Sequence, residues 1–313
     1  MRFRLLASSV LAVILASCGG EKNEIPLIGK AEVNNDRASA LYAEAQAADK
    51  EGKRGKAIKL YDKLADDMPT SIPYASDARF RQGELLEQDG DIQKSFAAYQ
   101  DFISRYNNSN KYQTALNRQA AMAQSAADGH VKTSFLGLKA SISDEKITDM
   151  LAKVRQNAPS SPTASQAQFS IGQVWESRNS AATATKATAA YRELVVEYPD
   201  SKEAPEGQFR IGKILLDQAK QGNQDQANLD RAKQALQDYV RQYPNHHRVG
   251  EAKQLIANIG GQDIERSYDI AQFYERKGDI GSAKFYYEEV MRQAKSGGTY
   301  DKAKARLAAL GGH

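Results

Sequence analysis

Cysteine is almost missing from this 313-residue chain, in which Cys18 is the single thiol. Aromatic residues make up only 8% of the sequence and hydrophobic residues 41%, which is thin for one large globular core. Beyond the first 17 residues, no segment approaches the run of about 18 apolar residues that a transmembrane helix needs. These shortages favour an extended architecture that exposes much surface.

Motifs of catalysis are missing as well. The chain has no glycine-rich phosphate loop, no HExxH zinc motif and no nucleophile elbow. Acidic residues are abundant, but no two of them stand out as an acid/base pair. We therefore expect no enzyme activity, no catalytic residue and no cofactor. The 43 basic and 39 acidic residues are interspersed, which argues against a nucleic-acid partner.

Two of the four histidines, His246 and His247, stand side by side in the segment YPNHHRVG. Adjacent imidazoles can bind a metal, but no third ligand lies near them at a suitable spacing in the sequence. We therefore expect an exposed loop here and no metal site.

The N-terminal sequence indicates a role for the single thiol, that of Cys18. A short basic start precedes an apolar stretch over residues 5–16, which suits a signal peptide and is too short to span a bilayer. The following segment, LASC at residues 15–18, resembles the lipobox of bacterial lipoproteins. That resemblance implies cleavage before Cys18, acylation of this residue and attachment to a membrane through the acyl chains. Gly19 in place of an aspartate favours, by the same resemblance, the outer membrane and its periplasmic face.

Internal repeats follow this N-terminal region. A small residue, an aromatic residue two positions later and a second small residue three positions beyond recur in three segments: Ala78 to Gly83, Ala167 to Gly172 and Gly207 to Gly212. A second pattern recurs along the chain: a large apolar residue, here called the landmark, stands eight positions before a helix-ending Pro or Asn. The landmarks are Tyr61, Tyr99, Leu151, Tyr191 and Leu236, and Tyr287 matches in a sixth unit without the Pro.

This pattern predicts helix pairs similar to tetratricopeptide repeats, although the units are longer than the usual 34 residues. We expect an all-α, right-handed solenoid of about six helix pairs, with a closing helix near Thr299 to Leu310. The predicted organisation is a signal peptide at 1–17, a flexible lipidated tether at 18–37 and the solenoid at 38–313. Residues 111–165 fit the repeat poorly, so the solenoid could divide into halves at 38–125 and 160–313.

Most of the repeated residues are predicted to pack. Gly83, Gly172 and Gly212 should let the second helix of a pair approach the first closely, and Trp175 is expected in the core. If the first helices of the pairs line a concave surface, the residues after the glycines face a groove for protein ligands. These residues are Glu84, Gln173 and Lys213.

Two stretches, residues 41–110 and 231–291, resemble the BamD family of lipoproteins, which are subunits of the outer-membrane β-barrel assembly machinery. The more telling feature is Phe273-Tyr274 followed by Arg276 and Gly278, because the family ends in a helix pair of the form YYxxRGxxxxA. The resemblance implies a helical platform that binds the barrel-inserting subunit, other assembly lipoproteins and unfolded β-barrel proteins. The chain departs from the family in having about six repeats rather than five.

Two other function classes stay open at this point. The chain could be a different periplasmic tetratricopeptide-repeat lipoprotein, such as a secretin pilot or a cell-envelope coordinator. An enzyme or carbohydrate-binding solenoid is the third hypothesis, and the missing motifs speak against it.

Overall fold

The computed structural model describes residues 35–129, 132–135, 138–178, 180–221 and 226–311. The predicted signal peptide, Cys18 and most of the predicted tether lie outside these residues. Within them, thirteen helices and a two-stranded hairpin follow one another along the chain. The elements are α1 (Asn35–Lys50), α2 (Arg54–Asp67), α3 (Tyr74–Gln88), α4 (Ile92–Arg105), α5 (Tyr112–Ala127), β1 (Lys132–Phe135), β2 (Leu138–Ser141), α6 (Asp144–Asn157), α7 (Pro162–Glu176), α8 (Ala181–Glu197), α9 (Ala204–Gln221), α10 (Gln226–Gln242), α11 (Val249–Arg276), α12 (Ile280–Ala294) and α13 (Gly298–Ala309).

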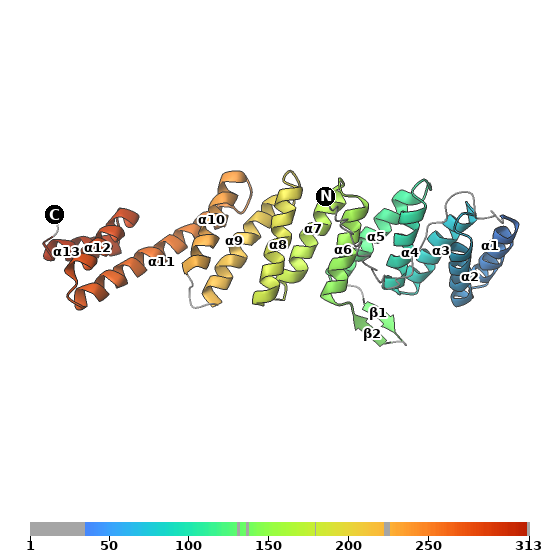
Figure 1. Cartoon of the computed structure of the whole chain (residues 1–313), viewed down its shortest axis with the longest axis horizontal. Helices are drawn as coiled ribbons and strands as arrows, with labels where there is room; N and C mark the ends of the chain where they lie inside the picture. The colour runs from blue at the N-terminus through green and yellow to red at the C-terminus, as the bar shows by residue number, and fades with distance from the viewer. Residues whose placement is uncertain (1–34, 130–131, 136–137, 179, 222–225, 312–313) are drawn as a thin grey trace, which may run out of the picture.

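The helices form an elongated array in which each packs mainly against its neighbours in the sequence (Figure 1). Six consecutive pairs, from α1/α2 to α11/α12, are closed by α13. This arrangement confirms the predicted all-helical solenoid of about six pairs and a C-terminal helix. Among the described helices, none is both long and apolar enough to cross a membrane.

The predicted turns and corners end the helices where the sequence indicates. Gly52, Gly90 and Gly278 follow first helices and have φ angles of 73°, 74° and 79°. This left-handed conformation suits glycine, which lacks a Cβ atom. At the corners, α8 ends two residues before Pro199, because proline lacks the amide that would continue the helix. At the corner before α7, the Ser161 side chain accepts a hydrogen bond from the amide of Ala164 and caps that helix.

The landmark side chains of the second helices are buried between the two helices of each pair. All six are at most 1% exposed: Tyr61, Tyr99, Leu151, Tyr191, Leu236 and Tyr287. A Cβ atom placed on Gly83, Gly172 or Gly212 would lie 3.0, 2.4 or 2.6 Å from an atom of the landmark side chain opposite. The predicted close approach of the two helices at these glycines is thus confirmed. Trp175, 9% exposed, lies in the core as expected, with the Lys186 ammonium 3.9 Å from its ring centre.

The poorly fitting region contains an insertion that the sequence analysis does not predict. Strands β1 and β2 pair antiparallel, with Lys132 opposite Ser141, and the hairpin projects from the edge of the array between α5 and α6 (Figure 1). Apart from this insertion the helix pairing continues through residues 111–165. One cluster of buried residues extends from Ala75 to Val174, so the two possible halves share a core.

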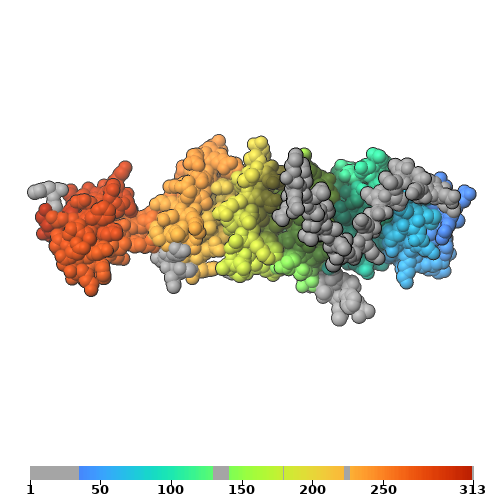
Figure 2. All heavy atoms as spheres, in the orientation of Figure 1, coloured from blue at the N-terminus to red at the C-terminus, as the bar shows by residue number. Residues whose placement is uncertain are grey.

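Helix α11 joins two parts of the array and is the longest described helix, with 28 residues. Ala252 and Ile259 in its first half pack into the cluster formed by α7 to α10, whereas Ala271 in its second half packs with α12 and α13. Gly260 and Gly261 lie between these halves, with open space where a side chain would be. The molecule narrows at this point (Figure 2).

Candidate protein-binding surface

The three residues predicted to bind protein occupy the same position on three first helices. Glu84 lies on α3 and pairs with Arg81 and Arg118 at 2.9 and 3.2 Å, which leaves 21% of its side chain exposed. Gln173 on α7 and Lys213 on α9 are exposed, and the Lys213 ammonium lies 3.7 Å from Asp217 of its own helix. The surface formed by α1, α3, α5, α7, α9, α11 and α13 is called here the first-helix face. Whether these residues bind a partner stays a prediction.

An ion-pair ladder connects neighbouring helices across the first-helix face. In each rung, a carboxylate of one first helix pairs with an arginine of the next first helix. The carboxylate stands four residues after the second small residue of the repeat, which is Ala45, Gly83, Gly172 or Ala271. The rungs are Asp49–Arg81 at 2.7 Å, Glu87–Arg118 at 2.9 Å, Glu176–Arg210 at 2.6 Å and Glu275–Arg306. Each rung therefore adds an ion pair to the contact between one repeat and the next.

Three of these carboxylates each accept a hydrogen bond from a buried tyrosine. The hydroxyl groups of Tyr99, Tyr191 and Tyr287 donate to Glu87, Glu176 and Glu275 at 3.2, 2.7 and 2.7 Å. Burial, together with the nearby Glu176 charge, raises the pKa of Tyr191, so this hydroxyl stays a hydrogen-bond donor. From the sequence, these landmark tyrosines are predicted to serve in packing only. A carboxylate four residues after the glycine is the signal that could have found the second role.

The ladder has two rungs without an ion pair, and at both of them the landmark is leucine. Between α5 and α7, Gln124 takes the place of the acid and Ser170 that of the arginine, and they share a hydrogen bond of 2.8 Å beside the Leu151 pair. On α9, Leu216 takes the place of the acid, and the landmark of its pair is Leu236. At both interruptions the tyrosine and the acid are therefore replaced together.

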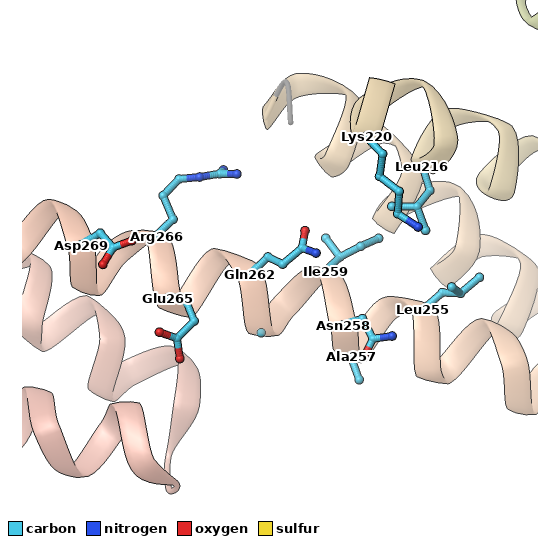
Figure 3. Close-up of a pocket in the computed structure, with 11 residues that line it drawn as sticks. Leu216, Lys220, Leu255, Ala257, Asn258, Ile259, Gln262, Glu265, Arg266 and Asp269 are labelled. Atoms are coloured by element: carbon cyan, nitrogen blue, oxygen red, sulfur yellow. The ribbon is translucent and has the colours of Figure 1, made fainter. Parts of the chain in front are cut away.

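Both interruptions of the ladder coincide with hollows in the surface. A hollow of 350 Å³ near the first interruption is lined by Ser170, the predicted binding residue Gln173, and the rung residues Glu176 and Arg210. A second hollow of 620 Å³ lies between α9 and α11 (Figure 3). Its lining combines apolar and charged side chains: Leu216, Lys220, Leu255, Ile259, Glu265, Arg266 and Asp269. The first-helix face thus offers two concave places of mixed chemistry, which suit protein segments better than a single small ligand.

Comparison with known proteins identifies the family of this chain. The family model described as outer membrane lipoprotein (YfiO) matches residues 141–310, which is more than half of the chain. The chain belongs to this outer membrane lipoprotein family. The match includes residues 231–291, the second stretch of the predicted resemblance. A tetratricopeptide-repeat model matches residues 77–109, inside the first stretch. Membership indicates an envelope protein of tetratricopeptide-repeat type. The predicted lipidation site Cys18 lies outside both the matched range and the described residues.

Solved structures with a similar helical arrangement are distant from this member of the outer membrane lipoprotein family. A tetratricopeptide repeat protein from Parabacteroides merdae is 12% identical, with coverage of 88% of this chain and 99% of that one and a TM-score of 0.30. PilF from Pseudomonas aeruginosa is 13% identical, with coverage of 87% and 99% and a TM-score of 0.29. At these values neither likeness carries an inference about partners. No curated protein sequence matches the chain.

Proposed function

We propose that this chain is a lipid-anchored scaffold at the periplasmic face of the outer membrane, with a role like that of BamD. It binds the barrel-inserting subunit of the β-barrel assembly machinery, other assembly lipoproteins and unfolded barrel proteins. The observation that carries this proposal is the family match over residues 141–310. The repeat architecture supports it, because stacked helix pairs present extended surfaces for protein ligands.

The first-helix face is the proposed contact surface. Its hollow beside Gln173 lies between polar and charged side chains held in place by the ladder, so the surface is ordered before a partner arrives. A preorganised surface loses less side-chain entropy on binding. The fixed acids and arginines also give the face a defined charge pattern for partner choice.

Affinity purification from envelope membranes tests the proposed partner. The full chain with a C-terminal tag should recover the barrel-inserting subunit after mild crosslinking. Recovery of a secretin without that subunit would support the alternative of a secretin pilot and contradict the proposal. Depletion of the chain should lower the levels of many barrel proteins, whereas a loss confined to one secretion system would also contradict it.

Charge reversal tests the proposed surface. Lys213→Glu on α9 should reduce recovery of the partner, because Lys213 is exposed on the first-helix face. Arg192→Glu is the matched control, since Arg192 is also a basic, exposed residue but lies on the second helix α8. Equal loss of the partner in both variants would indicate a general charge effect and exclude this surface.

Substitution of Cys18 tests the proposed anchor. Cys18→Ser removes the thiol that acylation needs, so the variant should remain uncleaved or leave the outer-membrane fraction. Membrane flotation and the mass of the processed chain measure both effects. Flotation of Cys18→Ser with the outer membrane would exclude lipid anchoring through this residue.

A further inference from the structure

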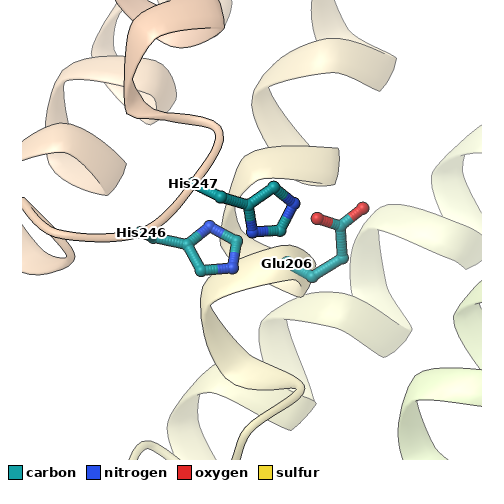
Figure 4. A group of neighbouring side chains, drawn as sticks. All are labelled: Glu206, His246 and His247. Atoms are coloured by element: carbon teal, nitrogen blue, oxygen red, sulfur yellow. The ribbon is translucent and has the colours of Figure 1, made fainter.

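The corner between α10 and α11 brings together three groups that can bind a metal. His246 and His247 come from the corner, and Glu206 comes from the first turn of α9. One potential ligand atom from each lies within 4.8 Å of the other two. The two rings and the carboxylate lie beside one another in the space between the corner and α9 (Figure 4). The third ligand that the sequence spacing did not supply is therefore provided by the fold.

A buried group orients one of the two imidazoles. The hydroxyl of Tyr239, a residue with no exposed surface, lies 2.6 Å from Nδ1 of His246. This contact leaves Nε2 of the ring for another partner. Metal-binding histidines in proteins are commonly held in this way through the nitrogen that does not bind the metal. The orientation of His246 is thus set by the core of the α9/α10 pair rather than by solvent.

A chain of ion pairs holds the Glu206 carboxylate. Glu176, Arg210, Glu206, Arg248 and Glu251 form an alternating chain, with consecutive contacts of 2.6, 2.9, 2.9 and 2.9 Å. The two guanidinium groups beside Glu206 are each paired with a second carboxylate, Glu176 or Glu251, which offsets their positive charge. Each arginine engages one oxygen of Glu206, so the carboxylate is held at a fixed place beside the histidines.

We propose that Glu206, His246 and His247 bind a divalent transition-metal ion of the zinc class, with water completing the coordination. Two imidazoles and one carboxylate are a ligand set for zinc, copper or nickel, whereas calcium and magnesium prefer oxygen ligands throughout. In a tetrahedral zinc site the ligand atoms lie about 3.3 Å apart. Binding therefore draws the exposed His247 inward and ties the α10–α11 corner to α9. This site does not depend on the proposed scaffold function.

Zinc titration of the full chain tests the proposal. The protein is purified in detergent through a tag without histidine, and zinc binding is measured by calorimetry. We expect one ion per chain, and His246→Ala and His247→Ala should each weaken binding at least tenfold. His130→Ala is the control, because it removes an imidazole that is not one of the three proposed ligands and should leave the affinity unchanged. A lack of saturable binding, or equal affinity in wild type and His246→Ala, overturns the proposal.

A second variant tests the role of Glu206 by a gain of affinity. Arg248→Gln removes the guanidinium that occupies one oxygen of Glu206, so zinc should bind at least threefold more tightly. Adding Glu206→Gln in this background should abolish the gain and weaken binding below wild type. Cobalt substituted for zinc should give the strong visible absorption of a four-coordinate ion. If Glu206→Gln leaves the affinity of the folded Arg248→Gln protein unchanged, the histidine pair binds without Glu206 and the three-ligand site is wrong.

Discussion

The α7/α8 pair and the α5/α6 pair occupy equivalent places in the array, yet they are built from different residues at every position of the rung. In α7/α8, Gly172 faces Tyr191, whose hydroxyl binds Glu176, which in turn binds Arg210. In α5/α6, the corresponding residues are Ala120, Leu151, Gln124 and Ser170, all of them uncharged.

The difference shows that the same place between two helix pairs can be filled by an ionic or by a neutral set of side chains. A tyrosine in place of Leu151 would bring a hydroxyl that needs an acceptor, and an acid in place of Gln124 would need the arginine that Ser170 replaces. The ionic set adds a charged link between repeats. The neutral one leaves a hollow beside Gln173 that a partner can occupy.

Gly172→Ala is expected to give the largest effect. Its Cβ would lie 2.4 Å from Cε1 of the buried Tyr191, so the two helices would have to move apart. We expect a loss of about 3 kcal/mol in the free energy of unfolding, measured by urea denaturation. Ala120→Gly, at the equivalent position of α5, should cost no more than about 1 kcal/mol. Similar losses for both variants would show that the close contact with Tyr191 does not require glycine at position 172.

Glu176→Ala should rank second. It leaves the Tyr191 hydroxyl without its acceptor and removes one of the two carboxylates that bind Arg210. We expect a loss of about 2 kcal/mol, because hydrogen bonds to a charged group are the strong ones. Gln124→Ala in the neutral rung should cost about 1 kcal/mol or less. A reversed order in thermal or urea unfolding would contradict the view that the ionic rungs carry more of the contact between repeats.

Much of this comparison is visible in the sequence, but not all of it. The spacing from Tyr191 to Pro199 and the glycines facing the landmarks are local patterns, so the helix pairs and their core could be predicted. The hairpin at residues 132–141 has no counterpart in the other repeats, which is why periodicity gave no sign of it. The proximity of Glu206 to His246, within 4.8 Å, could not be predicted either, because it depends on how the α10–α11 corner folds back towards α9.

Alkaline pH should reduce the difference between the two kinds of rung. Burial raises the pKa of Tyr191 above its ordinary value of 10.0. A pKa raised by folding means that the stabilisation is complete below pH 10 and is lost as the pH rises towards the folded-state pKa. We expect Tyr191→Phe to cost about 1 kcal/mol at pH 8. At pH 11, urea unfolding should show that wild type and Tyr191→Phe have the same free energy of unfolding. A stability loss from Tyr191→Phe that is equal at pH 8 and pH 11 would contradict the role of the hydroxyl as a hydrogen-bond donor.

Gly260→Ala and Gly261→Ala should give the smallest effects and with the opposite sign. Nothing lies within 4 Å of a Cβ atom at either position, so neither glycine is required by packing, in contrast to Gly172. Alanine favours a helix interior over glycine by about 1 kcal/mol, so each variant should stabilise the middle of α11 by up to that amount. Hydrogen exchange of the amides in residues 255–265 measures this local gain.

Slower exchange there with unchanged binding of the partner would mean that these glycines serve neither packing nor function. Slower exchange with weaker binding would assign them a hinge between the C-terminal helices and the rest of the solenoid.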